Sequence, residues 1–490
     1  MDRARARRFA VAAFALGVGL SGHIHGHRLY LDRINAMPLA RPRPAELPAA
    51  RPPVPASRLA VIIIDGLGHS SAMEVADLRE LTNRCPSRVL VPDFPSFTFP
   101  ALMTAATGVP PRDSGVRINA PPPFPELDSV SRRAAEAGIV VRLAPQSFSE
   151  LPALLQLPAR WESLETEALI SKLSSSERQL AWFYIGEVDE AGHRHGADSE
   201  EYRNAAREAG RLVLRVAGAL ERSGGGLERS SGALIVFSDH GHLRGGGHGG
   251  VEPEVMQAML IACDGPFVRG LELPPAPMRN LASTLSWALG VDAPRSSTGQ
   301  PMLDLFGLAA PTRDLAAELD ENRARSEFER SVRPRVSFAL IVSLAVFATA
   351  ASLHHRRAIR LSLADAVPTI LFLVGFGAPY LARGYTLSWS LPRGSAGFYG
   401  ETLLFGGLGV ALALWRARKD RRVEEAWLMA LIFGLPYLLS SAWVGLDTTK
   451  LAGPGVSYSV ILMATIEFYA CLPFGLRALV AESELSENRD

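Results

Sequence analysis

The sequence predicts an α/β domain with a mostly parallel sheet and helices on both faces, followed by an α-helical transmembrane domain. Short, continuous apolar runs end in acidic residues, helical patterns separate these runs, and long apolar segments fill the C-terminal third of the chain. Continuous apolar runs of strand length are typical of strands covered on both faces, as in a parallel sheet.

Three of these runs, LAVIII, LAWFYI and GALIVF, lead within a few positions into Asp65, Asp189 and Asp239. Open α/β sheets bind ligands at the carboxyl ends of their strands, so the three carboxylates are expected together at one edge. A helix is predicted over residues 198–222, where apolar residues recur at helical spacing and Asp198 or Ser199 can cap the start.

The composition excludes several classes of function. The chain carries 51 Lys and Arg against 50 Asp and Glu, so no basic field predicts nucleic-acid binding. Its three cysteines, Cys85, Cys263 and Cys471, form no Cys-x-x-Cys pair, which excludes a cysteine-rich metal site. Cys85 and Cys263 are both outside the cytoplasm in the predicted topology and could pair, but free buried thiols are favoured over a bridge, because nothing in the sequence shows a geometry that permits it.

The chain divides into five predicted segments. Residues 1–30 form a signal anchor, a first transmembrane helix or a cleaved signal peptide, and residues 31–57 form a Pro-rich linker. The α/β domain spans residues 58–310, and a charged linker helix spans 311–334. Residues 335–480 contain five apolar segments, each close to the length that crosses a bilayer.

The charge of the connecting loops predicts the orientation in the membrane. HHRRAIR and RARKDRR are basic, and all basic loops lie inside if the basic N-terminus is also inside. We therefore expect a multi-pass inner (plasma) membrane protein with an extracytoplasmic, periplasmic α/β domain and a cytoplasmic C-terminus. Glu401 and Glu467 lie within predicted spans and are expected to face protein or water rather than lipid.

Four motifs supply metal-binding side chains: VIIIDGLG, FPSFTFPALMTAATG, GEVDEAGHRHG and FSDHGHLRGGGHGG. Each alone fits an ordinary cap or salt-bridge partner, but their oxygen and nitrogen donors together suit zinc and also permit manganese. Thr98 begins a short predicted helix with Pro100 in its first turn and Gly108 after its end, where an anion is favoured. Thr98 or Ser96 also fits a helix N-cap, a role compatible with that of a nucleophile.

This ordered set resembles the alkaline-phosphatase superfamily, in particular its nucleotide pyrophosphatase/phosphodiesterases and glycosylphosphatidylinositol ethanolamine-phosphate transferases. The resemblance implies two zinc ions, a Thr98 nucleophile and a phosphate contact from Asn119. It further implies that Asp65, Thr98, Asp239 and His240 bind one metal, and that Asp189, His193 and His248 bind the other. Two metals would neutralise the phosphate oxygens and activate the hydroxyl.

Departures from the family pattern shape the expected substrate. His248 follows His240 closely, as in the ethanolamine-phosphate transferases, which favours a lipid. Ala101 replaces the asparagine common in phosphodiesterases, which argues against nucleotides, and the sulfatase motif Cys-x-Pro-x-Arg is absent. Three histidines that match no family role are expected either to support the ligands or to lie on the surface: His69, His195 and His242.

The leading functional prediction is transfer of a phospholipid headgroup, such as phosphoethanolamine, through a covalent phospho-Thr98. The first alternative is an extracytoplasmic phosphodiesterase or pyrophosphatase that hydrolyses the same intermediate, and the second is a non-catalytic membrane scaffold. The expected partners are a phospholipid or phosphodiester substrate and the membrane, without nucleic acid. The oligomeric state is left open.

Overall fold

The structure is a computed structural model that describes residues 54–117, 119, 124–145, 148–222, 232–250 and 252–309, with isolated positions between 371 and 412. The predicted N-terminal anchor, the charged linker helix and almost all of the five predicted spans, with Glu401 and Glu467, lie outside these residues and stay predictions. Within the described parts, no helix combines the length and the apolar character needed to cross a bilayer. The chain divides into two compact units, and the α/β fold lies in the unit of residues 37–324 and 390–394.

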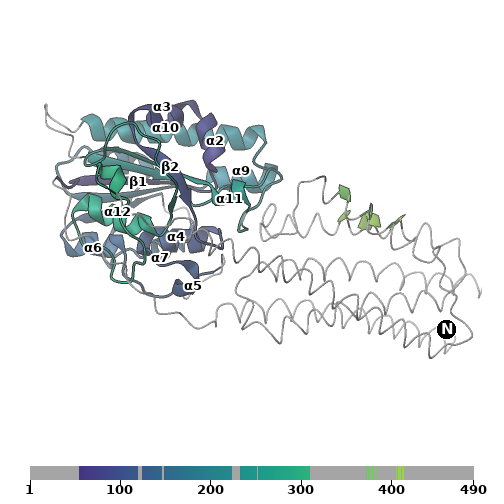
Figure 1. The fold of residues 1–490 in the computed structure, drawn as a ribbon, viewed down its shortest axis with the longest axis horizontal. Helices are drawn as coiled ribbons and strands as arrows, with labels where there is room; N and C mark the ends of the chain where they lie inside the picture. Colours follow the sequence, from purple (N-terminus) through teal and green to yellow (C-terminus); the bar gives the residue numbers. More distant parts are fainter. Residues whose placement is uncertain are drawn as a thin grey trace, which may run out of the picture. The chain divides into compact units, whose positions relative to one another are not determined.

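A single mixed sheet forms the centre of the α/β fold (Figure 1). Its strand order is β4-β3-β5-β1-β6-β7-β2-β8, and among these strands only β7 runs antiparallel to its neighbours. The mostly parallel sheet is therefore confirmed. The strands are β1 (Arg58–Ile64), β2 (Ser87–Val91), β3 (Val140–Ala144), β4 (Glu162–Ser163), β5 (Gln179–Ile185), β6 (Gly232–Phe237), β7 (Ala258–Asp264) and β8 (Ala276–Pro277).

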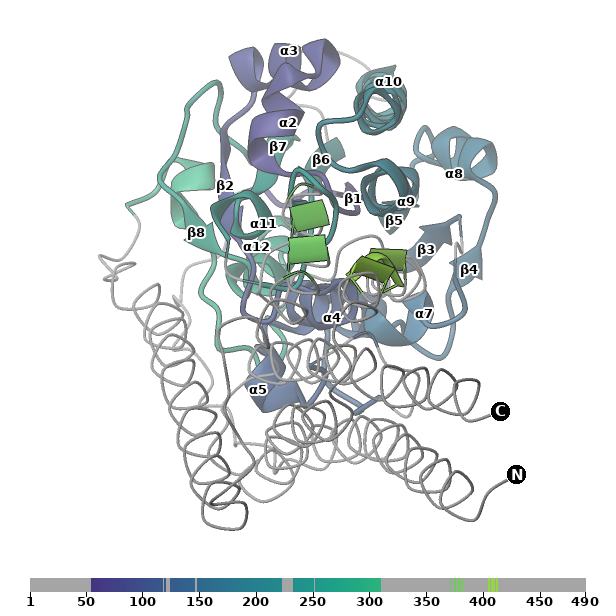
Figure 2. The same cartoon turned by 90° about the vertical axis from the view of Figure 1, so that its right-hand side faces the viewer.

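Helices cover both faces of the sheet (Figure 2). One face carries α2 (His69–Glu74), α3 (Ala76–Arg84), α8 (Thr166–Lys172), α9 (Glu187–His195) and α10 (Glu200–Arg222). The other face carries α4 (Thr98–Thr107), α6 (Val130–Glu136), α7 (Leu151–Leu154) and α12 (Asn280–Leu289). Short helices occur in the connections: α5 (Pro111–Ser114), α11 (Pro253–Met256) and η1 (Leu303–Phe306).

The central strand β1 is buried on both sides, as its uninterrupted apolar sequence predicts. Leu59, Val61 and Ile63 enter the core beneath α4 and α12, and the alternate residues enter the core beneath α10. Successive side chains of a strand point to opposite faces, so a strand between two helix layers needs an apolar residue at every position.

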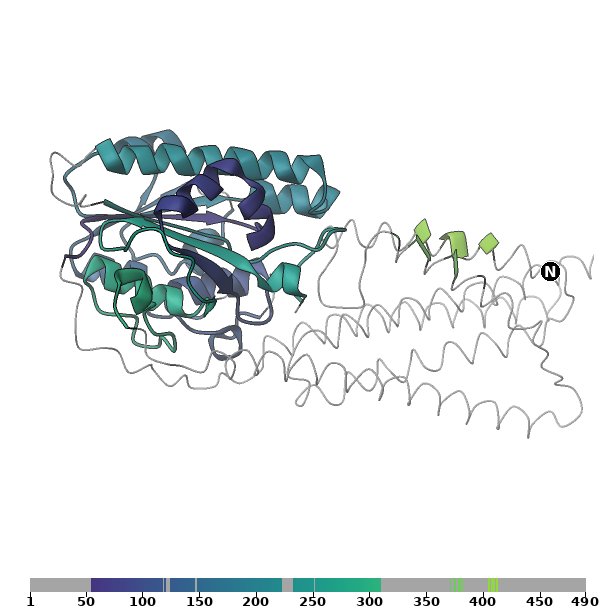
Figure 3. The same ribbon diagram turned by 45° about the horizontal axis from the view of Figure 1, so that its top comes forward.

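The predicted helix over residues 198–222 is α10, which lies along the sheet in Figure 3. Of the two possible caps, Ser199 is the one used, because its Oγ accepts a hydrogen bond from the Tyr202 N–H at 3.1 Å. Asp198 instead pairs with Arg244 at 3.1 Å.

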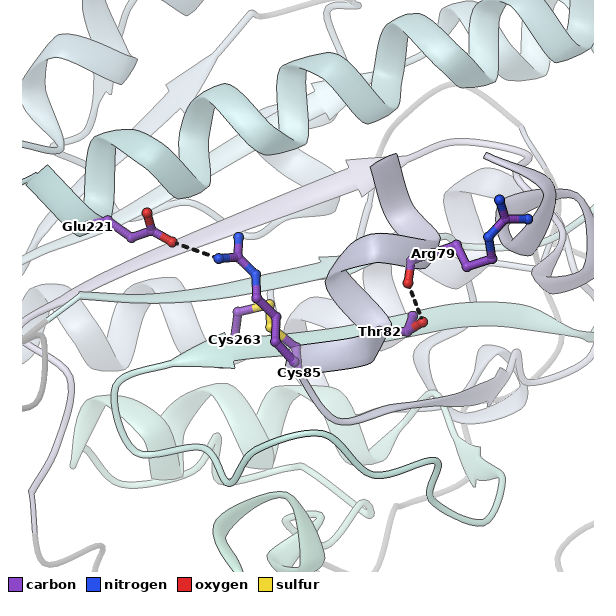
Figure 4. The surroundings of a disulfide bond; sticks show 6 residues. Arg79, Thr82, Cys85, Glu221 and Cys263 are labelled. Atoms are coloured by element: carbon purple, nitrogen blue, oxygen red, sulfur yellow. Dashed lines mark hydrogen bonds and ion pairs between the residues drawn. A yellow bond between two sulfur atoms is a disulfide. The ribbon is translucent and has the colours of Figure 1, made fainter. Parts of the chain in front are cut away.

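Cys85 and Cys263 form a disulfide, so the expectation of free thiols was wrong (Figure 4). The antiparallel register of β2 and β7 explains the pairing. Ser87 lies opposite Ile261, and the next residues outward continue that register, because the Ala262 N–H donates to the Pro86 carbonyl. The two Cα atoms therefore lie 4.9 Å apart, within the range that a disulfide spans.

Candidate active site

The three strand-end carboxylates meet at one edge of the sheet. Asp65 directly follows β1, and Asp239 lies two residues beyond the end of β6. Asp189 lies on α9, which begins two residues after β5 ends. Because β5, β1 and β6 are neighbours in the sheet, the parallel topology brings together residues that are far apart in the sequence.

A first group of candidate metal ligands consists of Asp65, Asp239 and His240. The His240 Nε2 lies 3.3 Å from Asp65 Oδ1 and 3.4 Å from Asp239 Oδ2. All three residues are buried, and neither of these carboxylate oxygens has a hydrogen-bond donor. Buried oxygens of this kind need a positive partner, and a divalent cation supplies one.

The pKa values of this first group also favour a bound cation. Burial and the nearby carboxylates of Asp239 and Asp189 raise the pKa of Asp65 well above its usual range. Burial likewise raises the pKa of Asp239 to about 7, although the hydrogen bond from the Gly66 N–H acts to lower it. Two carboxylates held this close resist simultaneous ionisation unless a cation lies between them.

A second group gathers around Asp189. The Nε2 atoms of His193 and His248 face each other at 3.0 Å, and they lie 3.4 Å from Asp189 Oδ2 and Oδ1, respectively. Donor atoms of Asp189, His240, His242 and His248 all lie within 4.8 Å of one another. Burial raises the pKa of Asp189, but the nearby His193 and the hydrogen bond with His242 outweigh it and hold that pKa well below its usual value.

The histidines present the nitrogen that a metal requires. His240 Nδ1 contacts the Gly241 carbonyl and His248 Nδ1 contacts the Ser96 carbonyl, each at 3.2 Å. A carbonyl only accepts hydrogen bonds, so both rings carry the proton on Nδ1 and leave Nε2 as a lone pair. Burial lowers the pKa of His240 to about 3 and that of His193 to about 4, which favours the neutral, metal-binding form. The residues of both groups therefore fit divalent cations.

Thr98 lies beside the first group, with its Oγ1 3.3 Å from His240 Nε2. It is the first residue of α4, which contains Pro100 and ends before Gly108 as predicted. The N-cap residue is Phe97, and no side chain caps the helix; the Ser96 hydroxyl instead donates to the Gly250 carbonyl. Neither Thr98 nor Ser96 is the N-cap, so the alternative role expected for them is wrong.

Asn119 lies over the first turn of α4. Its Oδ1 accepts a hydrogen bond from the Phe99 N–H at 2.9 Å, which satisfies one of the free N–H groups at the helix start. This bond leaves the amide NH2 of Asn119 as the donor to a ligand. Phe99 also stacks on Phe148, with centroids 5.8 Å apart, and meets Phe124 edge-on at 5.8 Å.

The sequence did not predict the contacts that two residues make at the site. The Tyr184 hydroxyl donates to Asp65 Oδ2, and His242 Nε2 lies 2.7 Å from Asp189 Oδ1. The sequence placed Tyr184 in a buried strand and left His242 without a specific contact. His69 begins α2 and His195 ends α9, and neither belongs to a ligand group among the described residues.

Residues 142–252 match the model of the type I phosphodiesterase/nucleotide pyrophosphatase family. The match confirms the predicted resemblance over this stretch, which contains Asp189, His193, Asp239, His240 and His248. Asp65, Thr98 and Asn119 precede it. No curated protein matches the chain.

Three solved structures are partly similar to the chain. A 2-O GAG sulfatase is 14% identical, with a TM-score of 0.42 over 52% of this chain and 75% of its own. Murine ectonucleotide pyrophosphatase/phosphodiesterase 5 is 13% identical, with a TM-score of 0.39 over 48% of this chain and 96% of its own. A phosphonate monoester hydrolase from Silicibacter pomeroyi is 15% identical, with a TM-score of 0.39 over 52% and 78%.

Proposed function

We propose that the chain is a two-metal phosphoryl-transfer enzyme that acts on phosphodiesters, with Thr98 as its nucleophile. The observation that carries the proposal is the convergence of two groups of carboxylate oxygens and imidazole nitrogens beside the first residue of α4. The first group is Asp65, Asp239 and His240, joined by Thr98. The second is Asp189, His193 and His248. Zinc suits these donors, and manganese is the second candidate.

The proposed reaction has two steps. Thr98 Oγ1 forms a bond to phosphorus while the bond from phosphorus to the leaving oxygen breaks, and the proton lost by the Thr98 hydroxyl balances the one gained by the leaving alcohol. The hydroxyl of an acceptor then attacks the phospho-Thr98 and restores the free threonine. Bound divalent cations neutralise phosphate oxygens and lower the pKa of a nearby hydroxyl. The Asn119 amide NH2 is positioned to hold a phosphate oxygen, because its Oδ1 is already occupied by the Phe99 N–H.

We further propose a phospholipid as donor, with transfer of a headgroup such as phosphoethanolamine. The short spacing from His240 to His248 resembles that of the ethanolamine-phosphate transferases, and this resemblance supports a lipid substrate together with the apolar segments of residues 335–480. Hydrolysis by water is the alternative, since water and an acceptor hydroxyl attack the same intermediate. The proposed donor is tested by following transfer of the headgroup from a phospholipid that carries a label on it.

The proposed location of the α/β domain is outside the cytoplasm. Disulfides persist in oxidising compartments and are rare in the cytosol, so the Cys85–Cys263 bridge supports export. The basic loops between the predicted spans support the same orientation.

The first experiment measures metal content and turnover of a chromogenic phosphodiester by the purified full-length protein. We expect about two zinc ions per chain. In Thr98→Ala, turnover should fall by at least about a thousandfold, because the nucleophile is lost. The matched control is His195→Asn, which removes an exposed imidazole from the end of α9 and should leave turnover unchanged.

A protein that folds but binds no metal and has no turnover would overturn the enzyme assignment and favour the scaffold. Mass spectrometry of acid-quenched protein tests the covalent step, with the phosphorylated group expected on the peptide that contains Thr98. A labelled product that forms only when an acceptor is added indicates a transferase, whereas release without acceptor indicates a hydrolase.

A further inference from the structure

We infer that His242 is a positioning residue that orients Asp189 for the second metal, and that it does not itself bind the ion. The inference rests on the proposed function, since it concerns one of the proposed ligands. His242 Nε2 lies 2.7 Å from Asp189 Oδ1. Its side chain is fully buried, so the contact is shielded from water.

The hydrogen bond on the other side of the ring determines which nitrogen carries the proton. The Gly247 N–H donates to His242 Nδ1 at 3.0 Å. A backbone N–H cannot accept, so Nδ1 holds a lone pair and the proton is on Nε2. Nε2 therefore donates to Asp189 and has no lone pair for a metal. His240 and His248 have the opposite arrangement, with Nδ1 against a carbonyl.

The ring of His242 packs closely against two glycines, which leave room for it because they lack a Cβ atom. A Cβ on Gly192 of α9 would lie 2.7 Å from both Cδ2 and Nε2 of His242, and a Cβ on Gly66 would lie 2.9 Å from the same atoms. Gly66 also has a φ of +72°, which disfavours other residues. The ring therefore packs between Gly66, in the loop after β1, and Gly192 of α9, the helix that carries Asp189.

The two proposed metal groups share one design. In each, a buried side chain outside the ligand set hydrogen-bonds to a ligand carboxylate: Tyr184 to Asp65 in the first, and His242 to Asp189 in the second. Such outer contacts fix the direction of the ligand oxygen, and their loss typically weakens metal affinity by about 10–100-fold.

The test measures zinc affinity of the full-length protein by competition with a chromogenic chelator. His242→Asn keeps an acceptor for the Gly247 N–H but does not reach Asp189, and it should lose about 10–100-fold in affinity for one of the two zinc ions. His242→Gln places an amide N–H near the position of Nε2 and should restore most of that affinity. Gly192→Ala leaves the imidazole in the chain but displaces it, and should weaken binding as well.

Cobalt substitution separates positioning from ligation. At saturating cobalt, the visible spectrum of His242→Gln should match that of the unmodified protein, because the coordinated atoms are unchanged. A changed spectrum with no rescue by Gln would show that His242 is a ligand and overturn the inference. Unchanged zinc affinity in both His242→Asn and Gly192→Ala would also overturn it. If the unmodified protein bound no zinc, the proposed function would fail instead.

Discussion

The imidazole rings of His240 and His248 stack with their centroids 3.6 Å apart and their planes at 12°. The two residues belong to different proposed metal groups, so the stacked rings lie between the two groups and contact each other directly. A change in one ring is therefore expected to affect both proposed metal sites. His248→Ala removes a proposed ligand of the second metal and one face of the stack on His240.

We expect His248→Ala to retain about one tightly bound metal per chain and to lose at least about 100-fold in turnover. Metal analysis after gel filtration, together with phosphodiester turnover, measures both effects. The control His195→Asn should retain the full metal content. Retention of two metals and of turnover would show that His248 is not a ligand.

Zinc affinity should depend on pH through Asp239, whose pKa is raised by burial to about 7 in the metal-free protein. Below this pH the carboxyl holds a proton that zinc must displace, so affinity should fall about tenfold per pH unit. His240 and His193 have pKa values of about 3 and 4 and stay neutral in this window. Calorimetry in buffers of different ionisation enthalpy should detect at least about one released proton per chain at pH 6, because the pKa of Asp65 is raised as well.

The raised pKa of Asp239 also determines how the stability of the metal-free protein depends on pH. The folded pKa of Asp239 lies above its unfolded value, so the metal-free folded state binds the extra proton. Its contribution to stability is present at low pH and is lost as the pH rises through about 7. A zinc affinity that stays constant from pH 7 to pH 5.5 would contradict this assignment.

Tyr184→Phe should weaken the first metal site without disturbing the fold. The change removes the hydrogen bond to Asp65 but keeps the ring, which packs edge-on against Phe148 at 5.2 Å. We expect a loss of about 10–100-fold in zinc affinity. The melting temperature of the metal-free protein, measured in parallel, should fall only modestly, because one hydrogen bond is lost while the packing of the ring is kept. A large loss of stability with unchanged zinc affinity would assign Tyr184 a purely structural role.

Removing the disulfide should lower stability and leave the site intact. In Cys85→Ala/Cys263→Ala we expect a loss of about 2–4 kcal/mol in the free energy of unfolding, because the bridge closes a long loop. Denaturant titration measures this change. Peptide mapping provides the control, since neither cysteine should react with an alkylating reagent before reduction. Alkylation of both in the unreduced protein would show that the thiols are free.

The convergence of the carboxylates could be predicted from the sequence because strand ends are marked locally. An apolar run that stops at an acid identifies both the strand and the edge of the sheet, as for Asp65 and Asp239. The start of α4 was also predictable, since Pro100 and Gly108 mark its two ends. Both features can be read from residues that are neighbours in the sequence.

The remaining features depend on distant pairings. The Cys85–Cys263 bridge follows from the register of β2 against β7, an antiparallel pair that no local pattern announces. The contact between His242 and Asp189 needs the loop after β6 to fold over α9, with Gly192 leaving room for the ring. Neither periodicity nor motif spacing encodes such a contact.

The position of β1 at the centre of the sheet has a consequence for synthesis. Both of its partners, β5 and β6, lie more than a hundred residues later in the chain. The strand therefore emerges from the ribosome long before any partner exists, with seven residues that are all buried in the final fold. Pairing between such distant strands is slow, and an exposed apolar strand is prone to aggregate. We therefore expect the newly made chain to depend on a chaperone until β5 and β6 have been made.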